Sequence, residues 1–142
     1  MRPTLNDYLN DNMGKKVRDG QCVALIRDCV EVVYGIPHTG SVEGAIDIWR
    51  TRRANPKILQ YFHIVEGRPE RGDIIFFNPT SSNKYGHVAI VLEDKGDGFI
   101  IADQDGLPFI DPVKYAGFPI GLKTGFWNWT RYAGALRPKI LN

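Results

Sequence analysis

The stretch Asp19–Gly35, "DGQCVALIRDCVEVVYG", decides how this chain folds. Apolar residues recur along it at helical spacing, which predicts an amphipathic helix that begins at Cys22 and ends at Tyr34. Gly35 stands where a left-handed C-cap is favoured, and it should end the helix. The apolar stripe that we expect to face the core consists of Val23, Ile26, Val30 and Val33.

The two halves of the chain around this helix differ in pattern. The first half predicts two further short helices, Leu5–Asn10 and a helix from Ser41 to about Arg52, and Asn55-Pro56 should break the second. The second half predicts strands separated by turn residues, at 72–78, 86–94, 98–105 and 130–138. Helices followed by antiparallel strands are typical of an α+β fold with the helices packed on one face of a sheet.

The composition is that of an ordinary globular domain. The 142 residues suit a single domain, 1–142, with 43% hydrophobic and 24% charged residues. A net charge of +2 is too small to indicate nucleic acid. No apolar run reaches the roughly 20 residues that cross a bilayer, and "MRPTLNDYLNDN" lacks the apolar block of a signal peptide. We therefore expect a monomer, made in the cytoplasm, with no nucleic-acid or membrane partner.

The two cysteines occupy different places on the predicted helix. Cys22 stands at its start, where unpaired backbone N–H groups and the positive end of the helix dipole favour a thiolate, the nucleophilic form of the side chain. Cys29 follows two turns later, about 10 Å along the axis and too far away for a disulfide. We expect Cys29 to be a small buried apolar residue and Cys22 to be a candidate nucleophile.

A thiol nucleophile needs a base, and His87 is the best candidate among three histidines. His38 and His63 lie in stretches that favour solvated or structural roles. His87 opens the predicted strand 86–94, from which it can reach the start of a neighbouring helix. Strand alternation gives His87 one face in common with Ala89, Val91 and Glu93.

The turn after this strand determines which side chain faces His87. We expect a three-residue loop, Asp94-Lys95-Gly96, in which Gly96 supplies the left-handed position. This loop pairs His87 directly with Asp103, at a Cβ separation of about 5 Å, so that the carboxylate can orient the imidazole. We prefer it because it sets an acid opposite the base.

Two alternatives stay open at this point. A two-residue turn at Lys95-Gly96 would reverse the parity and present Gln104 to the histidine. Asp103 and Asp105, which share a face, are also residues that often simply end a strand.

The order of these motifs resembles the CHAP domain (cysteine, histidine-dependent amidohydrolase/peptidase), a member of the NlpC/P60-like group of papain-like peptidoglycan hydrolases. The matching motifs lie within 19–138 and are "GQC" at a helix start, "RGDIIFF", "YGHVAIV" and a following pair of acids. Family members occur in phage endolysins, virion-associated lysins and bacterial wall hydrolases. The resemblance implies a papain-like fold and a thiol hydrolase of bacterial peptidoglycan. The bond would be the muramoyl–L-alanine amide or an amide of the peptide stem or bridge.

The resemblance also implies a role for each matching residue. Cys22 matches the nucleophile, His87 the general base, and Gln21 the residue that helps to form the oxyanion hole. Well-known members carry a Glu at the third position and an Asn two residues later. Asp103 and Asp105 stand at these two places, and which of them orients His87 stays open.

Metal and substrate contacts follow from the same comparison. Some phage members bind calcium through an Asp-x-Asp run before the cysteine, but "KKVRDGQC" has only Asp19, so we expect no metal and no cofactor. Trp127 and Trp129 share a face at strand spacing and are candidates, with Tyr85, to line a groove for sugar or peptide. Core packing is the alternative for the two tryptophans.

Two other functions are compatible with the sequence. One is a catalytically silent wall-binding or phage-tail module, against which the presence of both Cys22 and His87 argues. The other is a different papain-like chemistry, such as that of an isopeptidase or acyltransferase. The chain could be a complete small lysin, acting on the cell wall in host cell lysis or from a virion, or a domain of a longer protein.

Overall fold

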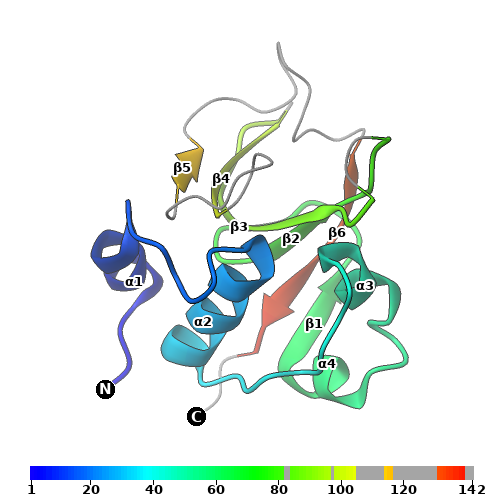
Figure 1. The fold of residues 1–142 in the computed structure, drawn as a ribbon, viewed down its shortest axis with the longest axis horizontal. Coiled ribbons are helices and arrows are strands. Elements are labelled where there is room, and N and C mark those ends of the chain that lie inside the picture. Colours follow the sequence, from blue (N-terminus) through cyan, green and yellow to red (C-terminus); the bar gives the residue numbers. More distant parts are fainter. Residues whose placement is uncertain (82–83, 97, 105–113, 117–130, 140–142) are drawn as a thin grey trace.

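The computed structural model describes residues 1–81, 84–96, 98–104, 114–116 and 131–139. Within them, helices come first and then pack on a six-stranded antiparallel sheet with the order β1-β6-β2-β3-β4-β5 (Figure 1). The predicted α+β class is therefore confirmed. The helices are α1 (Leu5–Asn12), α2 (Cys22–Tyr34), α3 (Ala45–Arg50) and α4 (Pro56–Tyr61). The strands are β1 (Phe62–Val65), β2 (Ile74–Phe77), β3 (His87–Asp94), β4 (Phe99–Asp103), β5 (Lys114–Ala116) and β6 (Tyr132–Pro138).

Helix α2 has the predicted bounds, but its buried face is rotated from the predicted stripe. Gly35 has φ of 73° and caps the helix by donating its N–H to the carbonyl of Glu31. The buried residues are Leu25, Ile26, Cys29 and Val30, whereas Val23 and Val33 are only half-buried. The packed face of the helix is therefore centred on two i, i+4 pairs, Leu25 with Cys29 and Ile26 with Val30.

The start of α3 and the whole of α4 correct the prediction. Helix α3 begins at Ala45 rather than near Ser41, because Gly44 is its N-cap. Helix α3 already ends at Arg50, and the dipeptide Asn55-Pro56, predicted to break it, starts α4 instead. Asn55 accepts a hydrogen bond from a first-turn backbone N–H at 3.0 Å, and Pro56 occupies the first helical position, which tolerates its missing N–H.

The four predicted strands are confirmed within about two residues at each end, whereas β1 and β5 were not predicted. Strand β6, close to the end of the chain, lies between β1 and β2 in the sheet. Alternation along β3 is as expected, with Val88, Ile90 and Leu92 in the cluster that packs against the helices. The opposite face of the sheet buries a second cluster, made of Ile75, Phe77, Ala89, Val91, Phe99 and Ile101.

The predicted β3–β4 turn has the wrong length, but Asp103 and His87 share one face of the sheet, as predicted. Val91 pairs with Ile101 rather than with Phe99, and a bulge follows it before Asp94 pairs with Phe99. Asp94 thus belongs to β3, and the connecting segment begins at Lys95. Gly96 has the predicted left-handed conformation, with φ of 91°. The pairing of Val91 differs from the predicted one by two residues, so the side chains from His87 to Val91 keep their expected faces, whereas Glu93, beyond the bulge, pairs with Ile100 and shares its face.

Two contacts fix strand β6 in the sheet. Arg137 donates two hydrogen bonds to the buried Asp73 carboxylate, at 2.8 and 2.9 Å, and the Glu70 N–H donates a third at 2.7 Å. Gly134 lies against the Trp49 ring so closely that a Cβ there would be 2.1 Å from Cζ2. Both contacts lie on elements other than α2 and β4.

Candidate active site

Cys22 is the first residue of α2, and Figure 1 shows that this end of the helix lies beside β3. Gln21, the N-cap, has an extended backbone (φ −83°, ψ 161°) and makes no side-chain capping bond. The first backbone N–H groups of a helix have no acceptor within it. The half-buried Cys22 thiol therefore lies where donors and the positive dipole end can stabilise an anion.

His87, the first residue of β3 and the predicted base, lies beside this thiol. Its side chain is buried and stacks on Phe77, with ring centroids 6.5 Å apart. Nε2 contacts Oδ2 of Asp103 at 3.0 Å, and the Cys22 thiol hydrogen bonds to the same imidazole. Because Nε2 is taken by the carboxylate, Nδ1 is the ring nitrogen left for Cys22. The structure thus brings Cys22, His87 and Asp103 together.

The environment of His87 favours its protonated form. Burial alone lowers its pKa, but the hydrogen bonds to Asp103 and Cys22 outweigh burial and raise the pKa to about 9. An imidazolium at neutral pH is the partner that a thiolate requires. By contrast, burial raises the pKa of Cys29 to about 12, and this thiol lies 1% exposed in the core, as predicted.

Asp103 reaches His87 diagonally rather than from the directly opposed position. With Val91 paired to Ile101, the residue across from Asp103 is Ala89, and His87 is two residues further along the same face. Diagonal neighbours on one face remain within reach of long or aromatic side chains. Asp105, the other predicted acid, lies outside the described residues.

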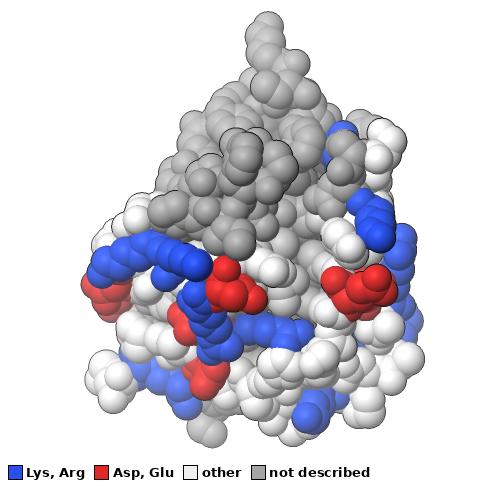
Figure 2. Space-filling model, viewed as in Figure 1, with Lys and Arg blue, Asp and Glu red and all other residues white. Residues whose placement is uncertain are grey.

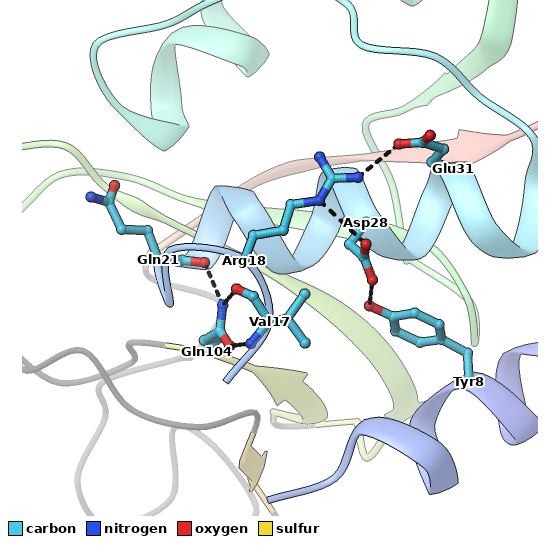
Figure 3. Close-up of polar contacts among 7 residues, drawn as sticks. All are labelled: Tyr8, Val17, Arg18, Gln21, Asp28, Glu31 and Gln104. Carbon is cyan, nitrogen blue, oxygen red and sulfur yellow. Dashed lines mark hydrogen bonds and ion pairs between the residues drawn. The ribbon is translucent and has the colours of Figure 1, made fainter. Parts of the chain in front are cut away.

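Gln104 has a role that the sequence did not reveal. It is fully buried, and its side chain contacts Val17 and the backbone of Gln21 rather than His87 (Figure 3). The alternative two-residue turn, which would present Gln104 to the histidine, is therefore wrong. Its partners lie more than 80 positions earlier in the chain, so only the fold connects them.

Tyr85 is 43% exposed, and its carbonyl accepts a hydrogen bond from the Ile46 N–H at 2.9 Å, which ties the approach to His87 to α3. His38 and His63 are exposed, as expected. The predicted substrate contacts Trp127 and Trp129 lie outside the described residues.

Charge and metal-binding groups give no second site in the part of the chain that the structure describes. Basic and acidic side chains are interspersed on the face seen in Figure 2, in keeping with the net charge of +2. Among these residues, no three His, Cys, Asp or Glu side chains gather as metal ligands, and metal independence stays a prediction. No described helix is both long and apolar enough to span a bilayer.

Solved structures with the same fold include that of Ly7917, with a TM-score of 0.62 and 22% identity over 96% of this chain. The structure of Ly7917 with the hydrolysing product of MDP has a TM-score of 0.65 and covers 96% of this chain. That of the wild-type endolysin LysIME-EF1 has a TM-score of 0.59 and covers 97%, and both are 22% identical to this chain. The likeness confirms the papain-like fold class. The matches span 63%, 63% and 65% of those chains, so this chain is shorter than each.

No curated protein matches the chain. The model of one family, the CHAP domain, matches residues 11–105, a span that contains Cys22, His87 and Asp103. Because this match covers more than half of the sequence, the chain belongs to the CHAP domain family.

Proposed function

We propose that the protein is a thiol hydrolase that cleaves an amide bond of bacterial peptidoglycan. The observation that carries the proposal is the contact of a helix-start thiol with a buried imidazole, which is held by a carboxylate at 3.0 Å. Nucleophile, base and orienting acid in this order can carry out acyl transfer. The family membership and the endolysin among similar folds support the cell wall as the substrate.

The first half-reaction forms an acyl-enzyme. The Cys22 thiolate attacks the amide carbonyl carbon, and a C–S bond forms while the oxygen becomes an anion. Backbone N–H groups at the start of α2, with Gln21 beside them, are the proposed donors to this oxyanion. The C–N bond then breaks, and the His87 imidazolium gives its proton to the leaving amine.

The second half-reaction releases the acyl group. Neutral His87 takes a proton from water, the hydroxide oxygen attacks the thioester, and the C–S bond breaks to give a carboxylic acid and the free thiolate. Asp103 holds the imidazole ring through Nε2 in both half-reactions and stabilises its charged form. Exposed Tyr85, two residues from the base, is a proposed contact for the bound substrate.

Digestion of purified peptidoglycan, followed by mass spectrometry of the released fragments, tests this proposal and identifies the bond. New N-terminal L-alanine without new reducing ends would indicate an amidase. New N-terminal glycine, or a new N-terminus within the stem, would indicate an endopeptidase. Intact peptidoglycan after treatment with folded protein would favour the silent wall-binding alternative.

The chain contains its own control for the nucleophile. We expect Cys22→Ser to abolish digestion, because a hydroxyl does not ionise at neutral pH, and Cys29→Ser to keep substantial activity. Cys29→Ser should lose some stability, since a hydroxyl enters apolar surroundings. Equal loss of activity in both variants, with both folded by circular dichroism, would refute the assignment of Cys22.

A further inference from the structure

Gln104 is a buried polar side chain that the mechanism above does not use. Its Oε1 accepts from the Val17 N–H at 2.7 Å, and its Nε2 donates to the carbonyls of Val17 and Gln21 at 3.0 and 2.9 Å. These partners fix which end of the amide is oxygen, because a backbone N–H requires an acceptor and carbonyls require donors. A side chain with 0% exposure thus holds both ends of the segment Val17–Gln21, the nucleophile loop, which leads into Cys22.

We propose that Gln104 is a positioning residue that aims the backbone N–H of Cys22 at the reacting carbonyl. The Gln21 carbonyl and the Cys22 N–H belong to one planar trans peptide and point in opposite directions. Fixing that carbonyl on Gln104 therefore directs the Cys22 N–H away from the interior, toward the side where substrate can bind. The inference rests on the proposed function, in which this N–H stabilises the oxyanion.

The position of Gln104, directly after Asp103 at the end of β4, links the nucleophile to its base. Asp103 and Gln104 are neighbours in the chain, but their side chains reach different partners. Asp103 contacts His87, and Gln104 contacts the nucleophile loop. One strand end therefore sets the relative placement of the imidazole and the helix start, although these lie far apart in sequence.

The nucleophile loop has a backbone that needs such support. Arg18 has φ of 53°, a left-handed conformation that is unfavourable for a residue with a side chain. On the outer side, the Arg18 guanidinium contacts Asp28 and Glu31 of α2 at 3.2 and 2.7 Å (Figure 3). Water screens this exposed network, so the buried contacts of Gln104 should control the position of the loop.

Two variants separate the contacts of Gln104, and a third provides a matched control. Gln104→Met keeps the volume and removes all three hydrogen bonds. Gln104→Glu keeps the acceptor for the Val17 N–H and loses the donors to both carbonyls. It replaces Gln104→Met as the test variant if that protein does not fold. Tyr8→Phe removes a hydrogen bond to Asp28 of 2.6 Å between α1 and α2 and leaves the Gln104 contacts in place.

The measurements are kcat and KM on soluble peptidoglycan fragments, and the alkylation rate of Cys22 in a Cys29→Ser background. For both Gln104 variants we expect kcat to fall about 10–100-fold with KM changed less than about threefold, because small displacements of reacting groups have effects of this size. The alkylation rate of Cys22 should fall about tenfold, because alkylation requires the thiolate that this geometry stabilises. Protonating the introduced carboxyl of Gln104→Glu restores one donor, so its kcat relative to wild type should rise as the pH falls. Tyr8→Phe should change none of these values.

A purely structural role would give a different result. Gln104 variants whose activity falls only in proportion to the unfolded fraction, with the wild-type alkylation profile, would overturn the inference. Failure of the wild-type protein to digest peptidoglycan would instead overturn the proposed function, and the alkylation comparison would still decide whether Gln104 positions Cys22.

Discussion

The carboxylate of Asp103 controls the protonation of His87, and Asp103→Asn makes this control measurable. The substitution keeps the shape of the side chain but replaces the charged partner of Nε2, at 3.0 Å, with a neutral amide. A hydrogen bond to a charged group contributes about 1.5–3 kcal/mol. Since 1.36 kcal/mol corresponds to one pKa unit, the pKa of His87 should fall from about 9 to about 7–8.

The assay is the pH dependence of kcat/KM on soluble peptidoglycan fragments. In the wild-type protein the alkaline limb should lie near pH 9, where the imidazolium that protonates the leaving amine loses its proton. In Asp103→Asn this limb should move to about pH 7–8. The rate at the optimum should fall by about 10–10³, less than the roughly 10⁴ of a serine protease triad, because the thiolate is already partly formed beside the imidazolium.

Stability provides a second readout that needs no substrate. The pKa of His87 in the folded state, about 9, lies above its ordinary value of 6.5, so the folded state binds the proton more tightly. The contribution of His87 to stability is therefore complete below pH 6.5 and is lost as the pH rises through 9. The melting temperature of the wild-type protein should decline across this window, and the decline should be smaller in Asp103→Asn.

Asp105 provides the comparison that can refute this reasoning. Asp105→Asn should have little effect, since asparagine is the usual residue of the family at the matching position. A severe loss in Asp105→Asn with a mild loss in Asp103→Asn would assign the orienting role to Asp105. An unmoved alkaline limb in Asp103→Asn would show that its carboxylate does not set the protonation of His87.

Three further predictions concern metal and stability. Activity should survive a chelator, and loss that calcium or zinc restores would show that the region around Asp19 had been misread. Gly134→Ala should reduce the free energy of unfolding by about 1–3 kcal/mol, because its Cβ would overlap the Trp49 ring; denaturant unfolding measures this. Asp73→Ala should reduce it by about 2–4 kcal/mol, through loss of the Arg137 and Glu70 contacts; kcat of the folded fraction should stay unchanged.

Elements whose signals are local could be predicted from the sequence. The bounds of α2 were correct because its ends depend on Gly35 and on the apolar pattern beside them. Helix α4 was missed because an Asn-Pro dipeptide can either break a helix or start one, and sequence alone gives no preference between the two roles. The short strand β1 follows α4 directly and pairs with β6, some 70 residues later, so its identity depends on tertiary pairing.

For the candidate site, the shared face of His87 and Asp103 could be predicted, but the residues that pair directly across β3 and β4 could not. Side chains alternate along a strand, so the choice of an odd turn placed Asp103 on the face of His87, where the structure has it. The bulge between Val91 and Glu93 has no glycine or proline to mark it, and together with the pairing of Asp94 with Phe99 at the turn it displaces the partner of Val91 by two residues. The sequence indicates Gln104 only as an alternative partner of His87, because its contacts with the nucleophile loop arise from the fold alone.

The arrangement predicts that activity and stability can be separated by position. Asp103 and Gln104 touch the base and the nucleophile loop from the end of one strand, so substitutions there change the geometry of the reacting groups. Asp73 and Gly134 support β6, which reaches neither group, so substitutions there change how much protein is folded and leave the folded site intact. A strand end that holds both partners also explains how a thiol and an imidazole from distant segments keep one relative placement, because any displacement of β4 moves both supports together.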